Sequence, residues 1–196
     1  MTVLGCDFSL NGSGLALWNG GVLEEWALFS RTKKLADKFS QVILIPDFDL
    51  QKDKLFWVCN RIKQFIIDHP EIKFVNLEQQ IGGGGIFSWV DGYGALKYIC
   101  YELDIPLITT SPTANKSYAG DGRADKNMME EFLLKEYKID LSEIGKEANN
   151  VVDAAHLAII GQHFYSRYHL NDIVMVSKKR GTILEKLAIK HKYVEK

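Results

Sequence analysis

The 196-residue sequence predicts an α/β fold: a mixed sheet of three antiparallel strands followed by parallel strands, with helices on both faces. Residues 3–29 contain three apolar runs separated by turn residues, which indicates a meander. From residue 55 onward, helical and strand periodicities alternate, which is typical of parallel strands joined by helices. With 46% hydrophobic and 25% charged residues, the composition is that of one soluble domain over 1–196, with a basic tail from about residue 170.

The first strands are marked by clear turn chemistry. Residues 3–8 suit a buried strand, Asn, Gly and Ser at 11–14 form a turn, and the apolar run returns at 15–18. Two glycines at 20–21 mark a second turn, after which 22–29 are expected to pair as a third antiparallel strand. These residues therefore predict the antiparallel half of the sheet.

The later elements follow from hydrophobic periodicity and from Pro and Gly punctuation. Residues 30–53 have the least regular pattern, and we interpret them as a loop or insertion. The elements expected after it are a helix over 55–68, a strand over 74–78, a glycine-rich loop over 79–85, a helix over 91–103, a strand over 106–110, a segment over 113–126 leading into a helix over 125–137, and a last helix over 149–165.

The cysteines and the hydropathy pattern bear on the compartment. Cys6, Cys59 and Cys100 are odd in number, widely spaced and surrounded by apolar residues, which favours small core residues in a reducing compartment over a disulfide or zinc framework. The sequence shows neither a signal-peptide pattern nor an apolar stretch of about 18 residues. We therefore expect a cytoplasmic protein, in a host cell if phage-encoded, with no membrane partner.

Charge is distributed unevenly along the chain. The net charge of the whole sequence is −1, but residues 177–196 carry seven Lys or Arg against two Glu, so the tail is at +5 and the rest at −6. Such a tail fits a phosphate-binding arm beside a cation site, and equally a solvated terminal helix.

Three carboxylates stand in apolar surroundings, where an unpaired charge is costly. Asp7 lies in the first strand, Glu78 ends the strand over 74–78, and Asp153 lies in the helix over 149–165. Buried acids repel one another unless a divalent cation joins them, and hard oxygen ligands suit Mg²⁺ or Mn²⁺. The sequence thus predicts a metal site; the alternative is three separately paired acids, with Asp7 accepting hydrogen bonds from the turn that follows it.

The last helix combines a polar face with small residues. Asn150 and Asp153 are three residues apart and project together, and His156 follows three residues later. Ala154 and Ala158 are small enough to let this helix lie close against a sheet. We therefore expect Asp153 to be held near the strand ends.

Four motifs stand in order along the chain. They are Leu-Gly-Cys-Asp-Phe-Ser-Leu-Asn-Gly-Ser-Gly at 4–14, Leu-Glu-Gln at 77–79, Ser-Pro at 111–112 with the lysine at 116 and Gly-Asp-Gly-Arg-Ala-Asp-Lys at 120–126, and Asn-Val-Val-Asp-Ala-Ala-His-Leu-Ala at 150–158. Together they resemble the motifs of the RuvC-type Holliday junction resolvases of the RNase H-like superfamily, phage-encoded members in particular. The resemblance implies an RNase H-like sheet and a nuclease of DNA recombination and repair.

By this resemblance, Asp7, Glu78, Asn150 and Asp153 are the catalytic and metal-binding residues, holding two Mg²⁺ (or Mn²⁺) ions. The ions would activate water and stabilise the leaving 3′ oxygen during phosphodiester hydrolysis. The implied activity is that of a crossover junction endodeoxyribonuclease, which cleaves four-way junctions or other branched DNA.

Residues that contact DNA are also implied. Lys116 and Lys126 match lysines that the family places near the scissile phosphate, and Arg123 belongs to the same segment. The glycine run before Phe87 and Trp89 suggests a loop that presents a ring to an unstacked base at the branch point, although both rings equally suit a core.

A homodimer is expected as well, because resolving a two-fold junction takes two symmetric nicks. The helix over 92–103 carries more apolar and aromatic side chains than one core-facing stripe needs, and the family dimerises through the corresponding region. The alternative is that these side chains fill the core.

The chain departs from the family pattern at three places. Asn150 stands where the family has an acid or a histidine, residues 31–54 are longer than the matching region, and the basic tail has no family motif. Asn150 is either native, with His156 or Glu147 recruited in place of the acid, or an inactivating substitution. A catalytically silent RNase H-like protein that binds branched DNA is the alternative function. A sugar-kinase or actin-like phosphate-binding domain is a more distant one, since that fold needs a longer chain.

Overall fold

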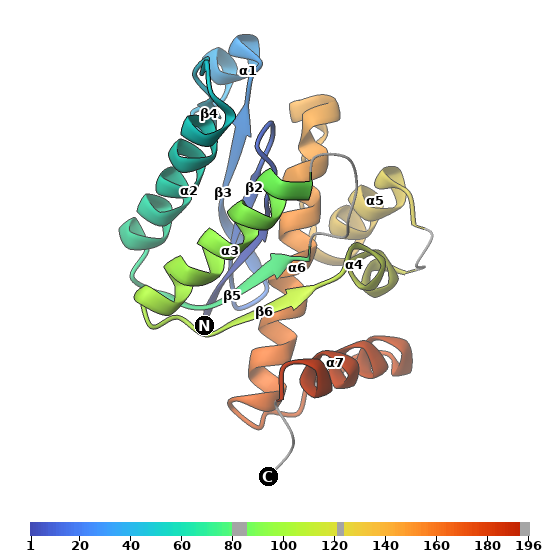
Figure 1. Ribbon diagram of the computed structural model, residues 1–196. Coiled ribbons are helices and arrows are strands. Elements are labelled where there is room, and N and C mark those ends of the chain that lie inside the picture. Colours follow the sequence, from blue (N-terminus) through green and yellow to red (C-terminus); the bar gives the residue numbers. More distant parts are fainter. Residues whose placement is uncertain (80–85, 121–123, 193–196) are drawn as a thin grey trace.

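A computed structural model describes residues 1–79, 86–120 and 124–192, with side chains for all of these except 86–90. It contains a six-stranded mixed sheet in the order β4-β3-β2-β1-β5-β6 (Figure 1). Strands β1 to β3 are antiparallel, while β4, β5 and β6 each run parallel to their neighbour, so the predicted mixed sheet is confirmed. The strands are β1 Thr2–Asp7, β2 Gly14–Asn19, β3 Val22–Ser30, β4 Val42–Leu44, β5 Ile72–Glu78 and β6 Leu107–Thr110.

Helices cover both faces of this sheet, as predicted. Helices α2 and α3 lie on one face, and α6 crosses the other with α4 and α5 beside it (Figure 1). Helix α6 packs against β1, β2 and β5, the strands at the centre of the sheet. The helices are α1 Lys33–Lys38, α2 Gln51–Asp68, α3 Ile86–Glu102, α4 Pro112–Ala119, α5 Lys126–Tyr137, α6 Ala148–Tyr168 and α7 Lys178–Lys190, with a 3₁₀ turn at Ser142–Glu147.

Alternation along the central strands divides the core in two, because successive side chains of a strand point to opposite faces. In β1, Leu4 and Cys6 face the core under α2 and α3, whereas Val3 faces the core under α6. In β5, Val75 joins the first core and Phe74 the second. The parity of a residue in β1, or in β5 from Phe74 onward, therefore decides whether its side chain meets α6.

The segment over 30–53 is not the loop that its irregular pattern predicted. It contains α1 and the short strand β4, which extends the sheet by pairing in parallel with β3. Val42 is buried, and the N–H of Leu28 donates to the carbonyl of Gln41 at 3.0 Å. A three-residue strand and a six-residue helix are too short to show a period, which is why the sequence pattern missed them.

Two helix starts also differ from expectation. Helix α2 begins at Gln51 and α3 at Ile86, each several residues before the predicted start. Helix α4 was not predicted, although its start has recognisable chemistry: Pro112 occupies the first turn and the Ser111 hydroxyl accepts from the Ala114 N–H.

The basic tail contains a helix that is docked on the rest of the chain. Helix α7 buries Leu184 and Leu187 in the core beneath α6. Its Arg180 donates to the carbonyl of Tyr118 at 2.9 Å and lies 4.7 Å above the ring of Phe132. Helix α7 is therefore not a fully solvated tail. Apolar packing and the contacts of Arg180 hold it against the rest of the chain.

The three cysteines are buried core residues, as their apolar surroundings predicted. All three cysteines are free and buried, and burial raises the pKa of the Cys59 thiol to about 11 and that of Cys100 to about 12. Both thiols are therefore protonated near neutral pH and pack as small apolar groups. Within the described ranges, every helix is too short or too polar to cross a membrane.

We expect the two buried histidines to contribute a loss of stability as the pH falls from 6.5 to 4, because both must stay neutral in the folded chain. Burial lowers the pKa of His156 and of His163 to about 4 each. Between that value and the unfolded value of about 6.5, only the unfolded chain takes up the protons, so unfolding becomes more favourable as the pH falls. The Tm of His156→Gln, measured between pH 6.5 and 4, should fall less steeply than that of the wild type. An equal slope would contradict the conclusion that His156 is neutral in the folded chain.

Candidate active site

Asp7 and Glu78 meet because β1 and β5 are parallel neighbours. Cys6 pairs with Leu77 in the register, and each acid is the next residue along its strand. Both acids have the parity of residues that face α6, so their side chains leave the sheet on the same side. The Asp7 and Glu78 side chains hydrogen-bond each other, which requires one of the two carboxyl groups to be protonated.

Asp153 is supplied to the same place by α6. The helix packs on β1 and β2, and its Asp153 is buried close enough to raise the pKa of both strand acids through its charge. Lys126 forms an ion pair with the Asp153 carboxylate. That lysine is placed by the start of α5, where the Asp125 side chain caps the helix by accepting from the Met128 N–H at 2.9 Å.

Burial dominates the electrostatics of the three acids. Burial, followed by the charges of Glu78 and Asp153, raises the pKa of Asp7 well above its usual value. Burial and then the charge of Asp153 raise the pKa of Glu78. Burial also raises the pKa of Asp153, although Lys126 acts in the opposite direction. Groups perturbed in this way are typical of functional sites.

The donor set fits a hard divalent cation. In the described part of the chain, no three acidic, histidine or cysteine side chains are close enough to form a metal site as they stand. Repulsion is instead relieved by the proton between Asp7 and Glu78 and by the lysine on Asp153. A bound cation would take over the role of both the proton and the lysine. The available carboxylate oxygens are the ligands that Mg²⁺ and Mn²⁺ prefer.

Asn150 lies on the same helix, beside the β1–β2 turn. A Cβ built on Gly12 would come within 2.8 Å of its Nδ2, so the amide packs directly on that turn. The two residues considered as its substitutes are engaged elsewhere. Glu147 accepts from the hydroxyls of Ser30 and Thr32.

His156 faces the core and not the acids. Its Nε2 lies 3.0 Å from the carbonyl of Met129, and its ring packs against Phe132 at 5.0 Å between centroids. The hypothesis that His156 acts as a metal ligand is therefore wrong. One further turn along α6 carries the side chain past the site and beneath α5.

The predicted DNA-contacting lysines surround Asp153. Lys126 is ion-paired with it, and the charge of Lys116 on α4 also acts on it. Arg123 lies outside the described residues, as do the side chains of Phe87 and Trp89. The structure thus brings together the three acids and two lysines.

Known structures share this fold. RuvC from Thermus thermophilus superposes with a TM-score of 0.60 and 17% identity, over 85% of this chain and 96% of RuvC. A structure titled T. thermophilus RuvC in complex with Holliday junction substrate gives a TM-score of 0.60 and 15% identity, over 81% and 91%. The yeast mitochondrial Holliday junction resolvase Ydc2 gives 0.51 and 16%, over 97% and 82%. The chain has the RuvC fold.

The sequence itself matches no family model and no curated protein. At 15–17% identity, the likeness to RuvC and Ydc2 establishes the architecture and not the chemistry. The expected RuvC-like fold is therefore confirmed.

Sequence reasoning missed Asn115, which lies beside the acids of this candidate site. It follows Ser111 by one helical turn on α4, and its side chain is buried and hydrogen-bonded to the Glu78 carboxylate. The available signal was its position one residue before Lys116 in the third motif. From the sequence alone, a polar residue at position 115 is expected to be exposed. Its burial follows only from the packing of α4 against α6.

Lys190 on α7 is the second residue that sequence reasoning missed. It donates to the side chain of Gln79 at 2.7 Å and to the carbonyl of Thr109 at 2.9 Å. The tail therefore reaches the residue that follows Glu78, a contact that no local pattern indicates.

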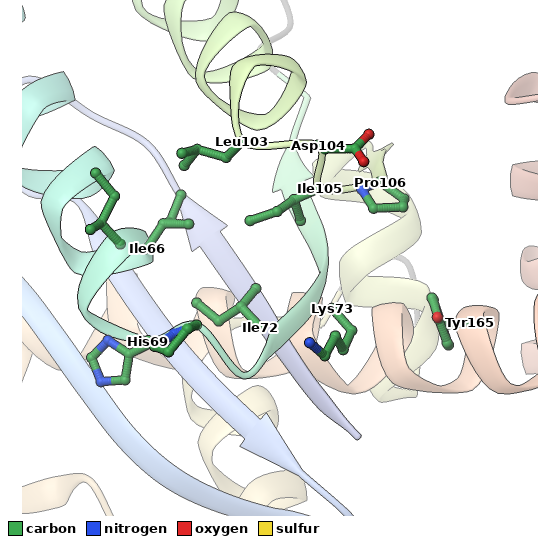
Figure 2. Close-up of a pocket in the computed structure, with 11 residues that line it drawn as sticks. Ile66, His69, Ile72, Lys73, Leu103, Asp104, Ile105, Pro106 and Tyr165 are labelled. Carbon is green, nitrogen blue, oxygen red and sulfur yellow. The ribbon is translucent and has the colours of Figure 1, made fainter.

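A groove of about 570 Å³ lies at the opposite end of the parallel strands (Figure 2). Ile66, Ile72, Leu103 and Ile105 line it, with Tyr165 of α6 at its side. Because the acids lie at the carboxyl ends of β1 and β5, this groove at the amino ends is separate from the candidate site. Shape alone would therefore direct attention away from the residues that carry chemistry.

Proposed function

We propose that this protein is a metal-dependent, structure-selective endonuclease that hydrolyses phosphodiester bonds in four-way junctions or other branched DNA. The observation that carries the proposal is the convergence of Asp7, Glu78 and Asp153 from two adjacent strand ends and one helix. The RuvC fold, seen elsewhere in complex with a Holliday junction substrate, supports it.

The three acids would hold the divalent ions, which supply an activated water and stabilise the leaving 3′ oxygen when bound. The chain itself contributes the surrounding charges. Lys126 and Lys116 stand beside Asp153, where they would neutralise the phosphate without reading sequence. Arg123, Phe87 and Trp89 remain predicted DNA contacts.

A panel of DNA substrates tests this function. We expect symmetric nicks near the branch point of a four-way junction with Mg²⁺ or Mn²⁺, no cleavage in EDTA, and little cleavage of linear duplex. Flaps and nicked duplexes show how broad the selectivity is. Tight junction binding without cleavage in either metal would favour the silent branched-DNA-binding protein instead.

We further propose a homodimer formed through α3. Leu96 and Ile99 of this helix are buried in the core, whereas Tyr98 and Tyr101 are 64% and 82% exposed. Two exposed tyrosines on one helix are a surface that a partner would cover. We expect light scattering at micromolar concentration to give twice the chain mass, and Tyr98→Asp with Tyr101→Asp to give the single mass.

Phe56→Asp is the matched control, because Phe56 is 70% exposed on the neighbouring helix α2. It should leave the dimer intact. A wild-type protein that stays at the single mass with and without junction DNA would overturn the proposed dimer.

Asn150→Asp should raise cleavage at low metal concentration. Asn150 is one helical turn from Asp153 on α6, and a carboxylate there adds a negative charge to the ligand set. We expect the Mg²⁺ concentration for half-maximal cleavage to fall by roughly tenfold. The neighbouring Asn149→Asp adds the same charge at a different angle on the helix and should change it little; an unchanged Mg²⁺ dependence for Asn150→Asp would remove residue 150 from the site.

A further inference from the structure

Asn115 links the two elements that carry Glu78 and Asp153. It lies on α4 with only 1% of its surface exposed. Its Nδ2 donates to the backbone carbonyl of Asp153 at 3.3 Å, and its side chain hydrogen-bonds the Glu78 carboxylate. One amide thus connects the end of β5 to α6 directly behind the acids.

The chemistry of its neighbours fixes the orientation of this amide. A carbonyl and a carboxylate are both acceptors, so the NH₂ group of Asn115 must face them and Oδ1 must face away. Oδ1 is buried and has no hydrogen-bond partner among the described residues. A buried carbonyl oxygen is costly when left unsatisfied, so it calls for a donor or a cation.

Asn76 shows that this protein otherwise satisfies buried asparagines. It lies in β5, two residues before Glu78, and is also fully buried. Its Nδ2 donates to the carbonyl of Leu157 at 2.8 Å, and its Oδ1 accepts from the Thr110 hydroxyl at 2.9 Å. Asn115 therefore leaves unsatisfied an acceptor of the kind that Asn76 satisfies, while its N–H groups bond the Asp153 carbonyl and the Glu78 carboxylate.

We propose that Asn115 is a positioning residue of the metal site: its amide N–H groups fix the Glu78 carboxylate relative to Asp153 and so hold the two acids in place for a bound cation. This deepens the proposed function and rests on it. Groups that orient ligands in this way set metal affinity even though they do not touch the metal.

Mn²⁺ binding to the whole chain without DNA tests the proposal, with free Mn²⁺ followed by electron paramagnetic resonance. Asn115→Ala is expected to weaken Mn²⁺ binding by roughly tenfold. Asn76→Ala is the matched control, because it removes a buried asparagine of β5 whose hydrogen bonds are all satisfied. It should lower the Tm and leave Mn²⁺ affinity within about twofold of the wild type.

Glu78→Gln separates failure of the inference from failure of the proposed function. If the wild type and Glu78→Gln bind Mn²⁺ equally, the acids are not the metal site and the proposed function fails. If Glu78→Gln loses binding while Asn115→Ala keeps it, the site stands and the role of Asn115 is overturned. Asn115→Val fills the same space without polar groups, and it replaces the alanine variant in this comparison if the latter does not fold.

Discussion

Asp7→Asn is expected to abolish cleavage of four-way junctions while leaving junction binding largely intact. The substitution removes one charge from the shared pair with Glu78 and thereby weakens the hold on a divalent cation. Binding rests on phosphate contacts elsewhere. We expect a rate lower by about 10² to 10³-fold or more, the size of effect seen when one electrostatic partner of a transition state is lost. Glu78→Gln should behave alike.

Single-turnover cleavage and gel-shift titration in Mg²⁺ measure the two effects separately. Asp53→Asn is the control, because Asp53 is an exposed acid in the first turn of α2. It should cleave and bind like the wild type. A near wild-type rate for Asp7→Asn would show that the acids are wrongly assigned.

Stability distinguishes lost chemistry from lost folding in this experiment. The pKa of Asp7 is raised in the folded chain, so the folded state holds a proton that the unfolded state has released. Stability is therefore lost as the pH rises from the unfolded pKa of about 3.9 through the raised value. Without metal at pH 7 to 8, Asp7→Asn should have a Tm equal to or above that of the wild type.

The positions of the strand acids were predictable because side chains alternate between the two faces of a strand with a period of two residues. Asp7 and Glu78 end apolar strand runs, and parity in a parallel pair sends both to one face. The resemblance of the four ordered motifs to the RuvC-type resolvases predicted the fold. The lysine contact of Asp153 was not predictable in this form, because Lys126 belongs to a different helix and its distance from α6 depends on how α5 packs.

The short and the docked elements lay beyond sequence reasoning. Strand β4 has too few residues to show alternation, and only its pairing with β3 defines it. Helix α7 looks like a basic tail because its charges dominate its composition, yet its few apolar side chains decide where it lies. The role of Asn115 could be inferred only once the structure showed it to be buried, because an asparagine on an exposed helix face would contact neither acid.

Gly5→Ala is expected to unfold or severely destabilise the protein, because α6 lies directly on the backbone of β1. A Cβ on Gly5 would come within 1.9 Å of the carbonyl oxygen of Ala154 and 2.6 Å of the nitrogen of Ala158. Both are backbone atoms, so no side chain can turn aside. Gly14 of β2 approaches the carbonyl of Asn150 as closely, so relief of the clash would require α6 to move away from both strands.

We expect Gly5→Ala to lower the free energy of unfolding by about 4 kcal/mol or more, a loss that only a few mechanisms such as core overpacking produce. Urea denaturation followed by circular dichroism measures it. Gly94→Ala is the control, because a Cβ at that exposed position of α3 meets nothing within 4 Å, and its effect should stay within about 1 kcal/mol. Cleavage should fall with Gly5→Ala even under conditions where the chain remains folded, since any retreat of α6 carries Asp153 away from Asp7 and Glu78. Equal stabilities for the two glycine variants would mean that α6 does not rest on β1 as closely as the sheet and its carboxylates require.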